Sequence, residues 1–433
     1  MGSVSERERV AHVVRRLSMG VHPDRLGALS DTDAAIAAAL DLSAPPPAPL
    51  DVPALTDYRQ QRVTDISGPI VWWAEQMRSG NRMIEERLTW FWHDHFATSV
   101  VKVKSPYLLY RQHLTIRQHA LGNFADLLVS VSKDPAMLLY LDGVTNQARQ
   151  VNENFGRECL ELFTLGIGGG YTQEDVVEAS RAFTGWFVNI PGRRFTRPDV
   201  PLWSANFLSP RHDSGEKTLL GTTGNLDMDG ALDVILEQPA TGRFIASKLY
   251  RELVGVEPDD ETAARLGDAF ARDYAILPLV EAVTAEPAFT DDAAVRAKAR
   301  TPVEKFVGLI QAVPGATVDA AGSNPRSGRR NQQQATLGQA LRAVGYIPFV
   351  PPNVGGFPGG ESLLGPHQLV HTFDLLAAIP TAPDPALTDD VAALFARFGA
   401  FDVSDRSRDV VTRERDPGRR LALVFTSPEY AAI

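Results

Sequence analysis

Apolar residues recur every three or four positions along most of the chain, which is the spacing of an amphipathic helix. This pattern predicts helices over residues 10–19, 31–42, 66–96, 107–121, 172–186 and 228–254, with further helices through residue 310. Asp31 precedes an alanine-rich run as a predicted N-cap, and Thr172 and Asp175 stand in capping-box positions. We therefore expect a mainly α fold, a large multi-helix orthogonal or bundle arrangement.

Four stretches interrupt the helical pattern. Proline-rich residues 43–49 predict a short extended linker. Residues 187–227 alternate turn residues with short aromatic or β-branched pieces, which predicts a small inserted β-hairpin region. Residues 313–335 predict a flexible loop, and the Pro/Gly-rich residues 346–362 predict a loop that covers the core.

Length alone allows one large domain or two closely joined ones. Because the helical pattern resumes soon after the linker, we expect a single large helical domain over residues 1–433.

Composition excludes several classes of protein. A formal charge of −10 and a pI near 5.5 argue against a protein that binds nucleic acid by neutralising phosphates. No apolar window is long enough for a membrane span, and the charged N-terminus lacks the apolar core of a signal peptide. These features predict a cytoplasmic protein that does not enter membranes. The single cysteine, Cys159, cannot form an internal disulfide and is expected to be buried.

The helix over residues 152–163 has two chemically different faces. One face carries the polar residues Asn154, Arg157, Glu158 and Glu161, and the other carries Phe155, Cys159, Leu162 and Phe163. Two carboxyl groups one turn apart repel each other, and burial would raise the pKa of one of them, as acid–base catalysis requires. The alternative is a solvated face with an ordinary Arg157–Glu161 pair. A glycine turn at 166–170 would bring this face beside Asp175, Glu178 or Arg181 if the next helix packs antiparallel.

Two histidine-containing segments add further candidates. His95 lies on the aromatic stripe of its helix and points inward, whereas His93 points elsewhere. Residues two apart on a helix cannot chelate one ion, so His95 is either a hydrogen-bonded core histidine or a site residue. His212 and Asp213 share a loop, where Asp213 either orients the histidine or closes an Asx turn. Motifs for zinc, di-iron and nucleotide binding are absent from the sequence.

Several motifs together resemble a known family. They are FWHDHF at residues 91–96, DPAMLLYLD at 134–142 with Asn146, the helix from Asn152 with its glycine turn to Gly166, YTQEDV at 171–176 and AFTGW at 182–186. Further matches are His12 to Leu17, His212-Asp213 with Lys217, and PPNVGGFPGG at 351–360. Over nearly its whole length the chain resembles the bacterial domain of unknown function 1800 family.

The resemblance implies a largely helical fold and a sulfatase-like partner protein, but it implies no particular reaction. Relatives often look exported, in contrast to the start of this chain. This sequence has Phe163 where many relatives have His, and Phe357 where Trp is usual. The first change weakens a metal site that would need a ligand just past Glu161.

Two functions fit these observations. The first is a hydrolase or transferase that uses carboxylate and histidine acid–base chemistry, with or without a divalent metal. Its predicted catalytic residues are Glu158, Glu161, His95 and His212, and its predicted substrate-binding residues are Asn154, Arg157, Asp213 and Arg181. The second is a non-catalytic binding or scaffold protein in which these side chains form a buried structural network. An open cavity with unpaired carboxylates favours the first, and mutual pairing without a cavity favours the second.

Overall fold

The fold is mainly α-helical, as the periodicity predicts. The computed structural model describes residues 3–54, 65–192, 196–313, 341, 344–377 and 390–433. Within these residues, the only sheets are two small antiparallel pairs of strands. Most of the predicted 313–335 loop lies outside the described residues.

The first part of the chain confirms most of the predicted helices. Its helices are α1 (Glu6–Leu17), α2 (Pro23–Ala28), α3 (Thr32–Leu40), α4 (Ser67–Ser79), α5 (Met83–His95), α6 (Val100–Val103) and α7 (Pro106–His119). Asp31 caps α3 by accepting a 2.8 Å hydrogen bond from the Ala34 amide. The predicted helix over residues 66–96 is divided by Gly80, which ends α4 in the left-handed conformation that favours glycine.

The middle part contains the helix predicted over residues 152–163, hereafter the signature helix, and the β region. Its elements are α8 (Phe124–Ser132), α9 (Pro135–Tyr140), η2 (Gly143–Thr145), α10 (Asn154–Glu158), η3 (Cys159–Thr164), α11 (Gln173–Ala182), β1 (Trp186–Val188), β2 (Ala205–Phe207), η4 (Ser209–Arg211), β3 (Lys217–Leu219) and β4 (Thr222–Gly224). Thr172 and Asp175 form the predicted capping box of α11. Strand β1 pairs with β2 and β3 pairs with β4, so the β region contains two small sheets rather than one.

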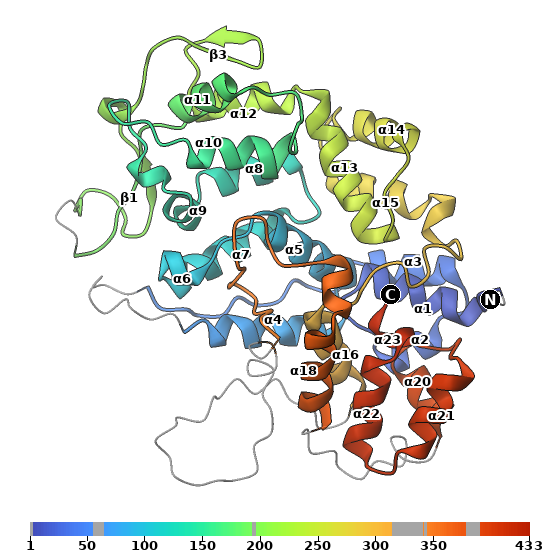
Figure 1. The fold of residues 1–433 in the computed structure, drawn as a ribbon. Helices are drawn as coiled ribbons and strands as arrows, with labels where there is room; N and C mark the ends of the chain where they lie inside the picture. The colour runs from blue at the N-terminus through green and yellow to red at the C-terminus, as the bar shows by residue number, and fades with distance from the viewer. Residues whose placement is uncertain (1–2, 55–64, 193–195, 314–340, 342–343, 378–389) are drawn as a thin grey trace.

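The remaining part is again helical. Its elements are α12 (Met228–Leu236), α13 (Pro239–Val254), α14 (Asp260–Phe270), α15 (Ile276–Thr284), η5 (Pro287–Phe289), α16 (Pro302–Ala312), η6 (Gly360–Leu364), α18 (Pro366–Ala377), α20 (Val391–Arg397), α21 (Asp405–Arg413), α22 (Pro417–Thr426) and α23 (Pro428–Ala431). In Figure 1, helices α8 to α12 lie above α4 to α7, while α13 to α15 lie beside α1 and α3. Both termini lie at the same end of the molecule.

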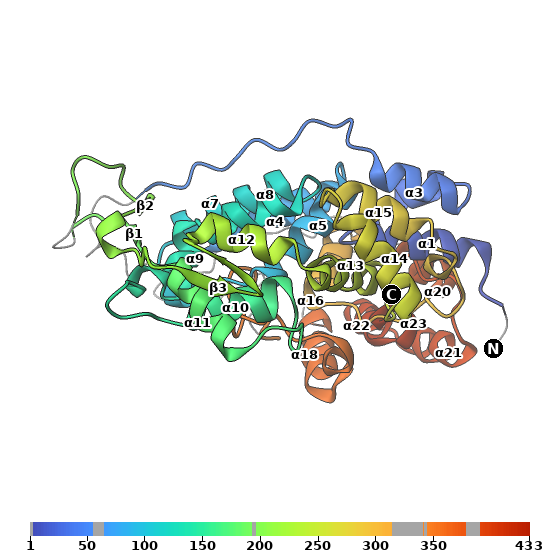
Figure 2. The ribbon, with the colours of Figure 1, turned by 90° about the horizontal axis from the view of Figure 1, so that it is seen from above.

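The proline-rich linker is held along one edge of the molecule. It runs as extended chain away from α3 in Figure 2. The Trp72 indole donates to the Ala48 carbonyl at 3.0 Å, and Arg82 donates to the carbonyls of Leu42 and Ala44. The side chains of Trp72 in α4 and of Arg82, the N-cap residue of α5, thus supply the hydrogen bonds that a regular element would have supplied.

The Pro/Gly-rich loop that follows Tyr346 docks on the C-terminal end of α5. The Phe349 amide donates to His93 Nε2 at 3.1 Å, and the Phe357 amide donates to Asp94 Oδ1 at 2.7 Å. The Tyr346 and Phe357 rings stack with Trp90. This loop brings chain from beyond residue 345 against two consecutive residues of α5.

A buried cluster of charges joins four distant segments around Arg87 of α5. The Arg87 guanidinium lies 2.6 Å from the Glu304 carboxylate of α16 and 3.2 Å from the Glu252 carboxylate of α13. It also donates to the carbonyls of Arg15 and Ser18 at the end of α1. Side chains of Arg87 and Glu304 are each only 1% exposed, so each charge depends on its partners for stabilisation.

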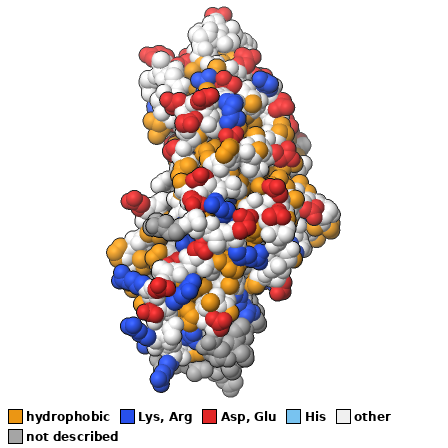
Figure 3. Space-filling model, turned by 90° about the vertical axis from the view of Figure 1, so that its right-hand side faces the viewer, with side chains coloured by type: hydrophobic (Ala, Val, Ile, Leu, Met, Phe, Trp, Pro, Cys, Tyr) orange, Lys and Arg blue, Asp and Glu red, His pale blue; other side chains and the backbone are white. Residues whose placement is uncertain are grey.

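The surface of one end of the molecule carries mixed charge. On the face seen in Figure 3, acidic and basic side chains are interspersed among apolar ones. Within the described residues, no helix has both the length and the apolar character needed to cross a membrane.

We expect Arg87→Met to destabilise the protein by about 3–5 kcal/mol, because Glu304 would be left as a buried charge without its partner. Denaturant unfolding followed by circular dichroism measures this change. The matched control is Arg78→Met, which removes an exposed pair with Glu75 and should cost at most about 1 kcal/mol. Equal losses in the two variants would contradict the assigned role of Arg87.

Candidate functional site

The signature helix changes its winding in the middle. It is α-helical over Asn154–Glu158 and becomes a π-helix over Cys159–Thr164. The Leu165 amide donates to the Leu160 carbonyl at 3.0 Å, five residues back, as π winding requires. Phe155, Cys159 and Phe163 are buried as predicted. Burial raises the pKa of the Cys159 thiol to about 12, which is typical of a structural cysteine.

The polar face of this helix is partly buried and internally paired. Arg157 bonds Glu153 at 3.0 Å and Glu161 at 3.3 Å, and it donates to the Gln173 side chain at 2.9 Å. Burial, with a smaller effect from the Glu161 charge, raises the pKa of Glu158. The Asn154 side chain donates to the Leu141 carbonyl at 3.3 Å. This face combines features of both alternatives: one carboxyl with a raised pKa and an ordinary arginine–glutamate pair.

The contact between the signature helix and α11 differs from the expected one. Gly156 lies against Ser180 so closely that a Cβ at position 156 would clash with the Ser180 side chain and backbone. Arg157 reaches Gln173, whereas Asp175 accepts a 2.6 Å hydrogen bond from the Leu220 amide. Because the Gly156 side of the helix faces α11, the contacts of Glu178 and Arg181 are made elsewhere.

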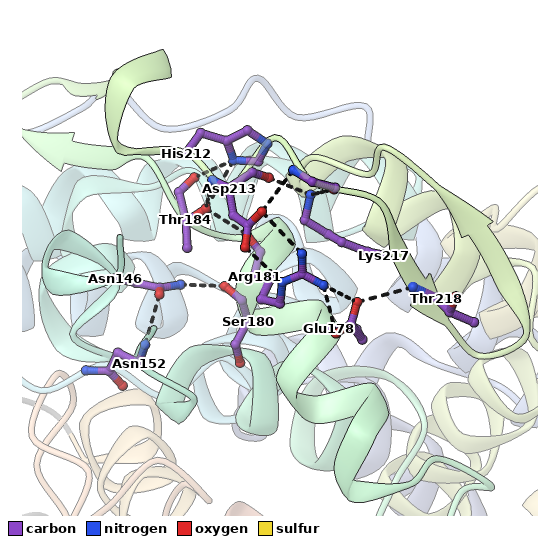
Figure 4. A network of polar contacts seen from close by, with 11 residues as sticks. Asn146, Asn152, Glu178, Ser180, Arg181, Thr184, His212, Asp213, Lys217 and Thr218 are labelled. Carbon is purple, nitrogen blue, oxygen red and sulfur yellow. Dashed lines mark hydrogen bonds and ion pairs between the residues drawn. The ribbon is translucent and has the colours of Figure 1, made fainter. Parts of the chain in front are cut away.

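Those two residues belong to a polar network with the His212 loop (Figure 4). Arg181 pairs with Asp213 at 2.8 Å and with Glu178 at 2.7 Å, and these hydrogen bonds raise its pKa. Arg181 in turn holds the pKa of Asp213 below its usual value.

The rest of this network also pairs with itself and with backbone. His212 Nδ1 lies 3.2 Å from the Thr184 hydroxyl and 3.1 Å from the Thr184 carbonyl. Lys217 donates to the Asp213 and Gly215 carbonyls. Asp213 contacts Arg181 rather than the His212 ring, and its carboxylate also accepts from the Gly215 amide, the contact of an Asx turn.

His95 lies in a different place, at the C-terminal end of α5. Its Nε2 lies 3.1 Å from the Phe163 carbonyl, and its Nδ1 lies 2.9 Å from the Lys248 ammonium group of α13. A carbonyl only accepts hydrogen bonds, so Nε2 carries the proton and Nδ1 accepts from Lys248. Burial, with the nearby Lys248 charge, holds the pKa of His95 well below 6.5. The imidazole is therefore neutral and fixed in one tautomer.

A cavity of about 380 Å³ opens beside this histidine. Its walls come from α5, α13, the chain before α16, and the end of the Pro/Gly-rich loop at residues 346–362, hereafter the cover loop, together with η6. The lining residues are Phe91, Asp94, His95, Lys248, Arg251, Glu252, Gly255, Ala297, Lys298, Ala299, Gly359, Gly360, Glu361 and Leu364. Lys298 pairs with Glu252 at 2.5 Å, which connects the cavity wall to the buried cluster around Arg87.

Asp94 and Lys248 line the same cavity, and burial moves the pKa of each toward neutral pH. Burial raises the pKa of Asp94 to about 6, although the hydrogen bond from the Phe357 amide and the Lys248 charge oppose this rise. Burial lowers the pKa of Lys248 to about 8, against the attraction of Asp94. Both groups therefore exchange protons close to neutral pH.

The glycine at position 356 permits the close contact between Asp94 and the cover loop. Its φ is +92°, a conformation that favours glycine, and a Cβ there would clash with the Asp94 carboxylate. The loop can therefore approach Asp94 closely enough for the Phe357 amide to donate to it.

The predicted site residues thus fall in three places. His95 lines the cavity, Glu158 and Glu161 lie on the signature helix with Asn154 and Arg157, and His212, Asp213 and Arg181 form the network of Figure 4. Asp94 and Lys248 were not among the predicted residues. Asp94 stands between the two histidines of the FWHDHF motif, which is a signal that could have found it; Lys248 has no local signal.

Among the residues that the structure describes, no three His, Cys, Asp or Glu side chains are grouped so as to hold a metal ion. A second cavity of about 270 Å³ lies among α1 to α5 and α16. Its buried carboxylate, Glu86, is held by Arg117 and by the Trp73 indole. The His95 cavity is therefore the better candidate for chemistry.

Comparison with known proteins agrees with the resemblance noted in the sequence. Residues 12–432 match the family of proteins of unknown function called DUF1800, and the chain belongs to that family. Comparison with curated proteins gives no match, and comparison with solved structures gives none either.

We expect Asp94→Asn to stabilise the protein by about 1–2 kcal/mol at pH 8. The raised pKa means that the folded state loses stability as pH rises from about 4 to 6 and Asp94 becomes charged; asparagine avoids this loss. Unfolding by denaturant at pH 8, 5 and 4 should show a gain that shrinks toward pH 4. Asp409→Asn, at an exposed position, is the control and should change stability by less than about 0.5 kcal/mol. A gain that does not vary with pH would contradict the raised pKa.

Proposed function

We propose that the chain is an enzyme, a hydrolase or transferase, whose active site is the cavity beside His95. The observation that carries the proposal is the hydrogen-bonded row Lys248, His95 and Phe163 carbonyl, with Asp94 on the same cavity wall. Many active sites place a reactive group beside a second group, and a third group orients the second. Here the three are the Lys248 amine, the His95 ring and the Phe163 carbonyl.

In this proposal each of these residues has a role. Asp94 and Lys248 exchange protons with the substrate, since burial has moved both pKa values toward neutrality. His95 accepts the Lys248 hydrogen bond and fixes the position of the amino group. Phe91 and Leu364 supply apolar wall, which reduces competition from water.

A structural role is better supported for the Arg181 network. Its side chains pair with one another and with backbone, which is the arrangement expected of residues that join α11 to the β region. We therefore extend the scaffold hypothesis to this part of the molecule only. Neither Glu158 nor Glu161 lines the cavity, so in this proposal they take no part in the reaction there.

Substitutions in the cavity should abolish activity while substitutions in the other two places should not. Purified protein is assayed with 4-nitrophenyl esters, phosphates and glycosides, with and without alcohol or amine acceptors. We expect Asp94→Asn and His95→Gln to lower kcat/KM at least about 100-fold on any substrate that is turned over. Matched controls are Glu158→Gln and His212→Gln, which should stay within about threefold. Loss of activity in the controls alone would place the active site elsewhere.

The pH dependence of kcat/KM should be bell-shaped, with limbs near pH 6 and pH 8. The bell shape is the same for two assignments of the protons. In one, Asp94 is the base and Lys248 the acid; in the other, protonated Asp94 is the acid and uncharged Lys248 the base. The pH profile of the residual activity should lose its acidic limb in Asp94→Asn. It should lose its basic limb in Lys248→Met. A profile flat from pH 5 to 9 would contradict the assignment.

Four expectations from the sequence stay predictions. They are the sulfatase-like partner implied by the family resemblance, the cytoplasmic location, the single domain and the optional divalent metal. Co-purification with tagged protein tests the partner, and elemental analysis of purified protein tests the metal.

A further inference from the structure

Lys248 has an environment that ordinary structural lysines lack. Its amino group makes a 2.9 Å hydrogen bond to a neutral histidine nitrogen and lies 5.5 Å from the centre of the Phe244 ring, and among the described residues it forms no ion pair with a carboxylate. Its neighbour Lys298, on the same cavity, is paired with Glu252 at 2.5 Å. The structure therefore contains one lysine held as a cation and, beside it, another whose charge is only weakly supported.

The direction of the His95 hydrogen bond matters for reactivity. Because His95 Nε2 donates to the Phe163 carbonyl, Nδ1 can only accept, and Lys248 must donate one N–H to it. An uncharged amine that donates in this way keeps its lone pair for another direction. The cavity bounded by Phe91, Asp94 and Leu364 lies beside it.

We infer that Lys248 is a nucleophile that forms an imine with a small aldehyde or ketone in the cavity. The inference rests on the proposed active site and names its substrate class. Buried lysines in partly apolar pockets are the usual source of such nucleophiles. A cavity of about 380 Å³ has room for a small carbonyl compound.

Asp94 can supply the proton transfers that imine formation needs. The uncharged Lys248 nitrogen attacks the carbonyl carbon, and the carbonyl electron pair moves to oxygen, which takes a proton from the Asp94 carboxylic acid. The new ammonium group returns one proton to the Asp94 carboxylate, giving a carbinolamine. Asp94 then protonates the hydroxyl group, which leaves as water while the nitrogen lone pair forms the C=N bond. The product is a protonated imine beside the Asp94 carboxylate, and return of the N–H proton to that carboxylate gives the neutral imine. No oxidant or reductant is required.

The charges around Lys248 are mixed, so they do not hold it as a strong ion pair. Groups that line the same cavity are Asp94 and His95 of α5, Arg251 and Glu252 of α13, Lys298 before α16, and Glu361 of η6. Arg251 is paired with Glu257 and Glu252 with Lys298, and within the described residues no ion pair joins Lys248 to Asp94. The carbonyl compound would bind in the cavity that both Asp94 and Lys248 line.

Reductive trapping tests the inference directly. The full-length protein is incubated at pH 7 with propanal and cyanoborohydride, and peptides are mapped by mass spectrometry over time. We expect propylation of Lys248 at least about tenfold faster than that of the exposed Lys102 and the half-buried Lys133, with the α-amino terminus as the only comparably fast amine. Because the wild-type protein reports which lysine reacts, this result does not depend on a variant that folds.

Two variants sharpen the test. Lys248→Arg should remove the fast lysine label, since a guanidinium does not form an imine, while Lys298→Arg should keep it. His95→Leu should slow labelling of Lys248 several-fold and shift the pH dependence of labelling. His95→Gln keeps a hydrogen-bond acceptor and should slow labelling less. Unfolding midpoints are measured to confirm that each variant is folded.

The outcome separates this inference from the proposed active site. Equal labelling of all lysines, or faster labelling of Lys298 than of Lys248, would overturn the assignment of Lys248 as the nucleophile. If the nucleophile fails while Asp94→Asn and His95→Gln still abolish turnover, the acid–base site stands without imine chemistry. If Lys248 is labelled selectively but turnover does not depend on these residues, the lysine is reactive and the proposed active site is wrong.

Discussion

The buried charges around Arg87 determine how the helices that form the cavity meet. Arg87 and His95 stand on the same helix, α5, while their partners Glu252 and Lys248 stand on the same helix, α13. The two contacts run in opposite directions along the two helices, so α5 and α13 cross in an antiparallel sense. An ion cluster inside the core thus sets the position at which a histidine and a lysine meet at its edge. Desolvation makes such a cluster expensive to bury, but its strict geometry fixes one arrangement of the helices.

The cavity shows why burial can create reactivity as well as stability. Burying a charged group costs free energy because the group loses its contact with water. Arg87 and Glu304 offset this cost by pairing, whereas at Asp94 and Lys248 it is only partly offset. Within the part of the chain that the structure describes, Asp94 accepts one hydrogen bond from a backbone amide. Lys248 donates one to a neutral imidazole and lies over the Phe244 ring. Groups so weakly held change protonation state readily, which is the general property of residues that transfer protons. Complete pairing, as at Arg181 and Asp213, has the opposite effect and keeps both groups charged.

Much of the fold could be predicted from local pattern. The caps at Asp31 and Thr172, the buried face of the signature helix and the inward direction of His95 all depend on residues within one or two turns. The π winding after Glu158 could not be predicted from a 3.6-residue period. That period left Leu160 off the apolar face and put Leu162 on it, whereas Leu160 is fully buried and Leu162 only half-buried. The candidate site was only partly predictable for a different reason. His95 and Lys248 are 153 residues apart, and nothing near Lys248 in the sequence distinguishes it from other helical lysines. The three groups of polar residues looked like one site because helical spacing reports which face a residue occupies, and not which neighbour that face meets.

The cover loop has a consequence for the order in which the protein acquires its chemistry. Asp94 is enclosed by residues 356 and 357, which the ribosome adds more than 250 positions later. Until that loop has been synthesised and has docked, the Asp94 carboxyl cannot receive the Phe357 hydrogen bond and is exposed to water on that side. A nascent chain that has already formed α5 and α13 would therefore hold an aspartate that is an ordinary weak acid. The environment that raises the pKa of Asp94 is therefore complete only when the C-terminal third of the chain is in place.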